Sequence, residues 1–108
     1  MKINFENSDY DLKVSWYKNN HRLCVFLKND DEEICITTND NTIKIDMPNI
    51  TLLDSFISDS PLLKELANKN IITGYKEYDF FEAVSFDLNV LAEYDPIGTK
   101  QFLELLNI

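Results

Sequence analysis

The chain has 108 residues, and its 19 Asp and Glu against 10 Lys and Arg give a net charge of −9. This length fits a single domain, residues 1–108, and 44% hydrophobic residues with only two Gly exclude long disordered stretches. The negative charge repels phosphate backbones and anionic lipids, which argues against direct binding to nucleic acid or to a membrane.

The first two predicted strands lie in the N-terminal quarter of the chain. Residues 10–16 alternate apolar and polar side chains, the period of a strand with one face on a core. A polar turn at residues 18–21 follows. Residues 22–28 carry apolar side chains on both faces, so we expect this strand to be central in its sheet and covered on both sides.

The next two predicted strands follow turns rich in Asn and Asp. Residues 29–32 form a turn, after which Ile34 and Ile36 resume the alternation and predict a hairpin. Another turn at residues 39–41 precedes an alternating stretch at residues 42–47. We therefore expect an antiparallel meander of four strands, or five if residues 3–5 join it.

After Pro48 the apolar spacing changes to that of helices. Residues 52–57 and 62–67 each carry apolar side chains at helical spacing. Between them, Asp59 or Ser60 can cap a helix that has Pro61 at its first position, where proline costs no hydrogen bond. We predict two short tandem helices, with the second ending near residues 68–70.

The last quarter predicts a strand and a helix. Thr73-Gly74 is expected to form a turn, and residues 75–89 an aromatic-rich strand that returns to the sheet. Asp95-Pro96 opens a C-terminal helix, in which Lys100 and Glu104 are spaced for an ion pair in water. The predicted fold class is therefore α+β.

Residue types that carry chemistry are sparse. His21, the only histidine, lies in a polar turn, where a solvated side chain explains it better than a general base. Cys24 and Cys35 are expected to be free thiols that pack as small apolar groups, and with His21 they lack the spacing of a zinc site. The acidic run at residues 30–33 lacks the glycine of a calcium loop. We expect no catalytic residue, metal or cofactor.

Acidic and aromatic residues alternate from residue 75 to residue 104. This stretch contains seven Asp and Glu residues but only two lysines. Aromatic side chains can anchor a protein partner while carboxylates attract a basic one. The alternative is that the aromatics belong to the core and the acids form the outer face of a strand. The residues predicted to bind a partner are Tyr75, Glu77, Tyr78, Asp79, Phe80, Glu82, Asp87, Glu93 and Asp95, of which Tyr75, Tyr78 and Phe80 are expected to be exposed.

Several short motifs follow one another along the chain: Arg22-Leu23, Thr38-Asn39, Leu53-Asp54, a helix ending before Thr73-Gly74, and the aromatic stretch at residues 75–86. Together they resemble a family of proteins carried by phages and conjugative elements, known as domain of unknown function 4313. The family has no established activity. The resemblance implies only a setting in a phage or mobile element.

These observations predict a small acidic, non-enzymatic binding protein of phage or mobile-element origin. By analogy with other small acidic domains of such elements, we expect it to inhibit a basic, nucleic-acid-handling bacterial protein, such as a defence nuclease or a toxin. The first alternative is a structural, homo-oligomeric accessory domain. A small enzyme using carboxylates is the second. Without a signal peptide or an apolar span of about 20 residues, the expected location is the cytoplasm of the bacterial host cell.

Overall fold

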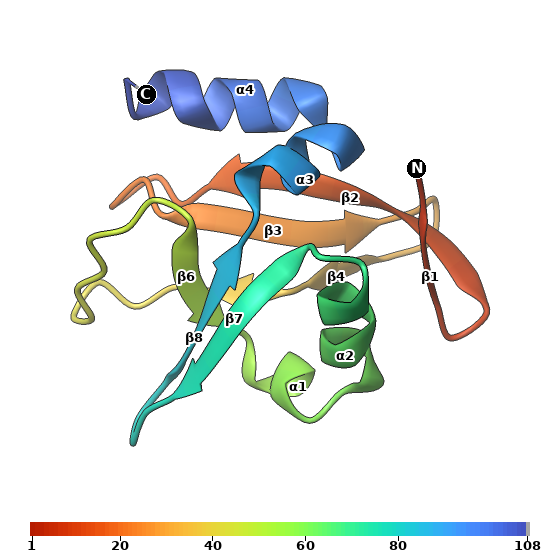
Figure 1. Ribbon diagram of the computed structural model, residues 1–108, viewed down its shortest axis with the longest axis horizontal. Coiled ribbons are helices and arrows are strands. Elements are labelled where there is room, and N and C mark those ends of the chain that lie inside the picture. Colours follow the sequence, from red (N-terminus) through yellow and green to blue (C-terminus); the bar gives the residue numbers. More distant parts are fainter. Residues whose placement is uncertain (108) are drawn as a thin grey trace.

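The computed structural model describes residues 1–107 (Figure 1). Within this range, the strands are β1 (Ile3–Phe5), β2 (Ser8–Trp16), β3 (Leu23–Lys28), β4 (Glu33–Cys35), β5 (Thr37–Thr38), β6 (Ile50–Leu53), β7 (Ile72–Glu77) and β8 (Glu82–Phe86). The helices are α1 (Ser55–Ser58), α2 (Pro61–Asn68), α3 (Leu88–Tyr94) and α4 (Pro96–Leu105). The predicted α+β class is confirmed, with its tandem helices and its C-terminal helix.

The first sheet is an antiparallel meander in the order β1-β2-β3-β4. Its two long strands, β2 and β3, pair with Val14 opposite Val25. The alternation seen in the sequence places Leu23, Val25 and Leu27 fully inside the core. Three of the four predicted meander strands are therefore present, the optional strand Ile3–Phe5 joins them as the first, and residues 42–47 do not belong to this sheet.

The second sheet is also antiparallel, in the order β5-β6-β8-β7. The chain enters it at Ile36, a fully buried residue between β4 and β5. The Ile36 amide donates to the Val25 carbonyl of the first sheet (3.1 Å), and the Ile36 carbonyl accepts from the Asp54 amide beyond β6 (2.9 Å). The buried Thr51 hydroxyl adds a bond to the Leu23 carbonyl (2.8 Å), so backbone-directed bonds join the two sheets.

Two predictions for residues 42–53 are wrong. Residues 42–47 alternate in polarity but pair with no strand among residues 1–107, and Met47 is 57% exposed. The strand is instead β6, whose Leu52 and Leu53 were expected to begin a helix. β6 is a central strand between β5 and β8, and Thr51, Leu52 and Leu53 are all buried. A short strand that is buried without alternation looks like a helix segment in the sequence.

The helix start predicted near Pro61 is confirmed. The Ser60 hydroxyl accepts from the Leu62 amide (3.1 Å), and Pro61 occupies the first turn of α2. The helix ends at Asn68, within the expected range. The preceding helix, α1, is a single turn capped by Asp54, whose carboxylate accepts from the Phe56 amide (2.9 Å).

The prediction for residues 73–89 misplaces the turn and merges two strands into one. Thr73 and Gly74 form no turn but lie in β7, at an irregularity in its pairing with β8. The turn comes later, and the single predicted strand is a hairpin of β7 and β8 followed by α3. Gly74 serves close packing instead, because a Cβ there would lie 2.6 Å from the Ser85 hydroxyl.

The two C-terminal helices lie against β2. The Asp95 carboxylate accepts from the Gly98 amide at the start of α4 (3.1 Å) and from the Val14 amide of β2 (2.9 Å). Gly98 packs so closely that a Cβ would lie 2.5 Å from the Val14 carbonyl oxygen. Phe102 is fully buried, and the predicted pair of Lys100 and Glu104 is present at 3.9 Å in water.

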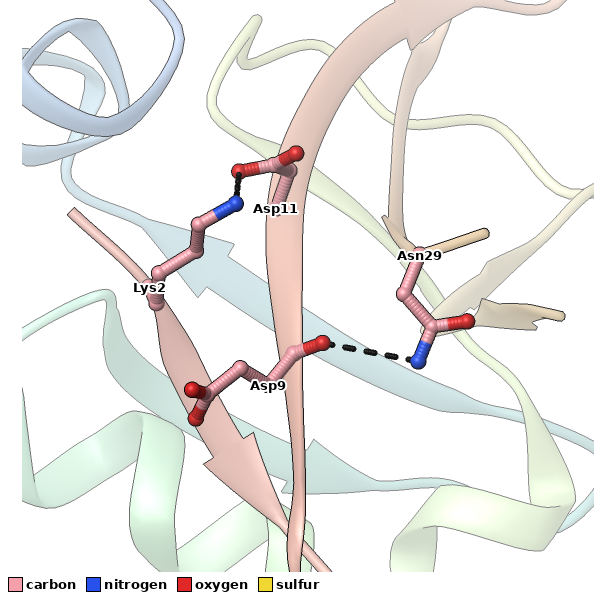
Figure 2. A network of polar contacts seen from close by, with 4 residues as sticks. All are labelled: Lys2, Asp9, Asp11 and Asn29. Atoms are coloured by element: carbon pink, nitrogen blue, oxygen red, sulfur yellow. Dashed lines mark hydrogen bonds and ion pairs between the residues drawn. The ribbon is translucent and has the colours of Figure 1, made fainter. Parts of the chain in front are cut away.

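The other end of β2 is covered by β1. Beyond that strand, Lys2 Nζ contacts the Asp11 carboxylate at 2.7 Å (Figure 2). The Asn29 side chain donates to the Asp9 carbonyl at 3.4 Å from the turn after β3, which Figure 2 shows on the other side of β2. The outer edge of β2 is therefore occupied by β1 at one end and by the start of α4 at the other.

One hydrophobic cluster extends through the whole fold. It includes Ile3 and Leu27 of the first sheet and Val84 of the second. Each helix adds at least one buried side chain to it: Ile57 from α1, Leu62 and Leu66 from α2, Leu91 from α3 and Phe102 from α4. The two sheets and four helices thus pack on a common core.

The residues singled out for possible chemistry lie apart from any common centre. His21 is exposed in the turn after β2, with a positive φ of 57°. Cys24 and Cys35 are free thiols, as expected. Cys35 is exposed, however, so the expectation that it packs as an apolar group is wrong. Its side chain lies on β4, an edge strand of the first sheet.

Candidate functional site

The β7–β8 hairpin carries most of the exposed aromatic side chains that the sequence singled out. Its turn is Asp79-Phe80, closed by the Tyr78 amide, which donates to the Phe81 carbonyl at 2.8 Å. The rings of Tyr78 and Phe81 stack with their centroids 4.5 Å apart, and Lys76 Nζ lies 5.1 Å from the Tyr78 centroid. These contacts stabilise the end of the hairpin locally.

Phe80 lies at the tip of this hairpin and is 96% exposed. Tyr75 and Tyr78 are 43% and 44% exposed, so the expectation that these three side chains face solvent is confirmed. Figure 1 shows the hairpin extending from the body of the molecule, with its tip at the side away from α4.

A groove of about 450 Å³ lies beside the hairpin. We call it the hairpin groove. Its other wall comes from the loop after β5 and from the junction of β6 with α1. The residues that line it are Thr38, Asn39, Asp40, Ile43, Leu52, Leu53, Asp54, Ser55, Glu77, Tyr78, Asp79, Phe80, Phe81 and Glu82.

The charges of the hairpin groove are all negative in the part of the chain that the structure describes. Two of its five carboxylates are used locally: Asp54 caps α1, and Asp40 accepts from the amide and hydroxyl of Thr42. Those bonds hold the pKa of Asp40 below its ordinary value. The hairpin supplies the other three, Glu77, Asp79 and Glu82.

Glu77 and Glu82 are direct partners across the hairpin. Like charges at such positions repel each other and destabilise a strand pair. One oxygen of Glu82 is also buried without a hydrogen-bond partner among residues 1–107. Partial burial, followed by the nearby Glu82 and Glu77 carboxylates, raises the pKa of Tyr75 above its ordinary value.

The structure brings together five of the nine predicted binding residues. Glu77, Tyr78, Asp79, Phe80 and Glu82 line the hairpin groove, and Tyr75 lies next to them on β7. The other three predicted residues are on the helical side of the chain. Glu93 is an exposed residue of α3, whereas Asp87 and Asp95 are its flanking caps.

The sequence predicted a basic protein partner from the acids of residues 75–104, and a homo-oligomer as the alternative from open strand edges. The prediction of a basic partner needs correction. Asp87 accepts from the Asn89 and Val90 amides, and Asp95 from those of Gly98 and Val14. Glu104 pairs with Lys100. Three of the seven acids thus have partners within the chain, and four of the seven lie on or beside α3 and α4 and not in the hairpin groove, so the seven acids are divided between two parts of the fold.

Sequence reasoning missed the far wall of the hairpin groove. Asp40 and Ile43 come from the loop that was expected to turn and enter a strand, and Asp54 was noted only within the Leu53-Asp54 motif. No local pattern links these residues to a hairpin about 25 to 40 positions later. Their proximity depends on β6 pairing with β8.

No group of three or more His, Cys, Asp and Glu side chains within residues 1–107 is arranged to hold a metal ion. In the same range, no helix is both long enough and apolar enough to span a bilayer.

Comparisons with protein-family models, with curated proteins and with solved structures found no match to this chain. The resemblance to the phage and conjugative-element family therefore stays a prediction from short motifs.

Proposed function

We propose that this chain is a non-enzymatic protein-binding domain that contacts its partner through the tip of the β7–β8 hairpin and the hairpin groove. The observation that carries this proposal is the 96% exposure of Phe80 beside the groove. Burying a phenylalanine side chain is worth roughly 1.5–3 kcal/mol, so one held almost completely in water is a strong anchor for a partner.

The neighbours of Phe80 support the same role. Tyr78 and Phe81, which flank the Asp79-Phe80 turn, stack on each other and keep the hairpin end ordered, so little conformational freedom is lost on binding. Tyr75 offers a hydroxyl donor next to the groove, and the carboxylates of Glu77, Asp79 and Glu82 accept hydrogen bonds. A partner that covers Phe80 and presents hydrogen-bond donors would satisfy all of these groups.

Inhibition belongs to the same proposal. A domain of this size inhibits an enzyme when the surface it covers includes the enzyme's active site. As predicted from the sequence, the target would be a nucleic-acid-handling bacterial protein, a nuclease or a toxin, in the cytoplasm of a bacterium that carries the phage or mobile element.

Site-specific photocrosslinking tests the proposed contact. A photoreactive phenylalanine analogue replaces Phe80 in the whole chain, expressed in bacteria, and the matched control carries it at Ile97, an apolar α4 residue that is 70% exposed. We expect a discrete crosslinked protein from position 80 and none from position 97. Equal labelling from both positions, or no adduct from position 80, would contradict the proposal.

A substitution tests whether the contact matters. Phe80→Ser should leave the folded chain unchanged but prevent co-purification of the crosslinked partner, whereas Ile97→Ser should not. If the target is an enzyme, its activity in the presence of the Phe80→Ser chain should equal its activity without the chain. Full inhibition by this variant would show that the hairpin tip is not the anchor.

A further inference from the structure

The four outer strands of the two sheets differ in length. Within residues 1–107, β1 and β4 each have three residues and β5 has two, whereas β7 has six. Short edge strands limit unwanted pairing with other chains. The long β7 is therefore the one open edge on which a further strand could find several bonding positions.

The pairing of the hairpin defines which backbone groups of β7 are free. Tyr78 bonds Phe81 across the turn, and alternation along an antiparallel pair then directs the amides of Lys76 and Gly74 toward β8. The Phe86 amide of β8 points away from β7 and donates to the Asn49 carbonyl just before β6. This direction agrees with the same alternation along β8. The amides and carbonyls of Tyr75 and Glu77 consequently point to the open edge.

A second groove of about 700 Å³ runs beside this edge. We call it the strand groove. Figure 1 shows α1 and α2 beside β7, and α2 packs on that strand. The helical wall of the strand groove includes Pro61, Leu63 and Ala67 of α2, and the other wall includes Ile72, Gly74 and Tyr75 of β7. Its apolar side chains come from both walls.

These features define the chemistry of an occupant. An extended backbone can satisfy the free amides and carbonyls of Tyr75 and Glu77 together, and its alternate side chains would enter the strand groove. The groove carries one acid, Asp59, and one base, Lys64, so its lining is close to neutral. A second copy of this chain is a poor occupant, because two molecules of net charge −9 repel each other.

We propose that β7 takes up an extended, neutral peptide segment of another protein as an added strand, with alternate apolar side chains of that segment in the strand groove. This inference rests on the proposed role as a protein-binding domain but uses a different surface from the hairpin groove. The test of this inference measures the backbone amides of Tyr75 and Glu77, which the proposed contact at Phe80 does not involve.

The probe is a synthetic heptapeptide recovered from a random phage-displayed library on the whole chain. We expect recovered peptides to carry apolar residues at alternate positions. Saturating peptide should slow hydrogen exchange of the Tyr75 and Glu77 amides about tenfold or more, because each amide gains a hydrogen bond. The Lys76 amide, already bonded to β8, serves as the internal control.

A pair of variants separates the contribution of the Tyr75 backbone to peptide affinity from the contribution of its side chain. Tyr75→Pro and Tyr75→Ala both lose the ring, but only proline also lacks the outward N–H. We expect the peptide to bind the proline variant about tenfold more weakly than the alanine variant, as loss of one hydrogen bond predicts. Hydrogen exchange on the unaltered chain gives the decisive readout even if the proline variant fails to fold.

Three results would overturn the inference. One is recovery of no peptide, or of peptides that leave the Tyr75 and Glu77 amides unchanged. Another is equal affinity for the two Tyr75 variants when both are folded. The third is a stable dimer of the chain alone in which the same amides are protected. Phe80→Ser should not change peptide affinity, so failure here is distinguishable from failure of the hairpin contact.

Discussion

The outer edges of β2 and β7 are treated differently by the fold. β1 covers the first residues of β2, and Asp95 and Gly98 close on Val14 near its other end. Along β7, the amides of Tyr75 and Glu77 have no strand beside them within residues 1–107, and Tyr75 lines the strand groove. The same backbone chemistry is thus satisfied within the chain at one edge and left available at the other.

This difference separates residues that maintain the fold from residues that are free to bind. Asp95 and Asp79 look equivalent in the sequence, since both are acids near aromatic residues. Asp95 bonds two backbone amides at the covered edge, whereas Asp79 is an exposed turn residue. The four predictions below test the comparison from the largest expected effect to the smallest.

Removing the anchor of α4 should damage the covered edge most. Phe102 is fully buried against the core, and Phe102→Ala should lower the free energy of unfolding by about 3–5 kcal/mol. Urea denaturation followed by circular dichroism measures the change. Ile97→Ala, on the exposed side of the same helix, is the control and should change stability by less than about 0.5 kcal/mol. Equal effects of the two substitutions would contradict the assigned role of Phe102.

Removing the Asp95 carboxylate should have an intermediate effect. Asp95→Ala deprives α4 of its cap and leaves the Val14 amide without its acceptor, at a cost of about 1–3 kcal/mol. Asp95→Asn keeps one oxygen acceptor and should recover part of the loss. Asp79→Ala is the matched control from the hairpin. A loss as large for Asp79→Ala as for Asp95→Ala would remove the distinction between the two acids.

Removing an outward amide from the open edge should change stability little. Tyr75→Pro eliminates an N–H that bonds no strand, so we expect the free energy of unfolding to differ from that of Tyr75→Ala by less than about 1 kcal/mol. The measurement is the same urea titration on both variants. A much larger loss would mean that the Tyr75 amide already has a partner and that the edge is closed.

The pair at the start of β2 should show its effect in a pKa. The hydrogen bond and charge of Lys2 hold the pKa of the Asp11 carboxyl below its ordinary value of 3.8. A lowered folded-state pKa means that this contribution to stability is present above the unfolded-state pKa and is lost as pH falls through the folded-state pKa. Lys2→Met should therefore raise the pKa of Asp11.

An NMR titration of the Asp11 carboxyl carbon from about pH 2 to about pH 6 measures this shift. Asp40, whose carboxylate bonds Thr42 and not Lys2, is the control, and its titration should be the same in both chains. Because Lys2 and Asp11 are solvent-exposed, we expect almost no change in the urea midpoint at neutral pH. An unchanged Asp11 titration in Lys2→Met would mean that the ion pair in Figure 2 does not persist in solution.

Local signals in the sequence predicted the elements whose cause is local. Ser60-Pro61 and Asp95-Pro96 begin helices because the capping oxygen and the proline act on adjacent residues. Residues 10–16 and 22–28 form strands because their alternation matches one buried face. Exposure of Tyr75, Tyr78 and Phe80 was also predictable, because the alternation is weakest there.

Errors arose where the element depended on distant neighbours. Residues 42–47 alternate well but find no partner, and Ile50–Leu53 looks like a helix yet is a strand because β5 and β8 lie on either side of it. Similarly, the aromatic stretch was taken for one strand because its turn, Asp79-Phe80, contains no glycine.

The sequence by itself determined the α+β class, the helix starts and the inward faces of β2 and β3, because periodicity and capping act over a few residues. Only the tertiary structure decided that the Asp95 carboxylate also accepts from the Val14 amide, which loop forms the far wall of the hairpin groove and which strand edge stays open. These features depend on contacts between residues about 40 to 80 positions apart, and such contacts leave no local pattern in the chain.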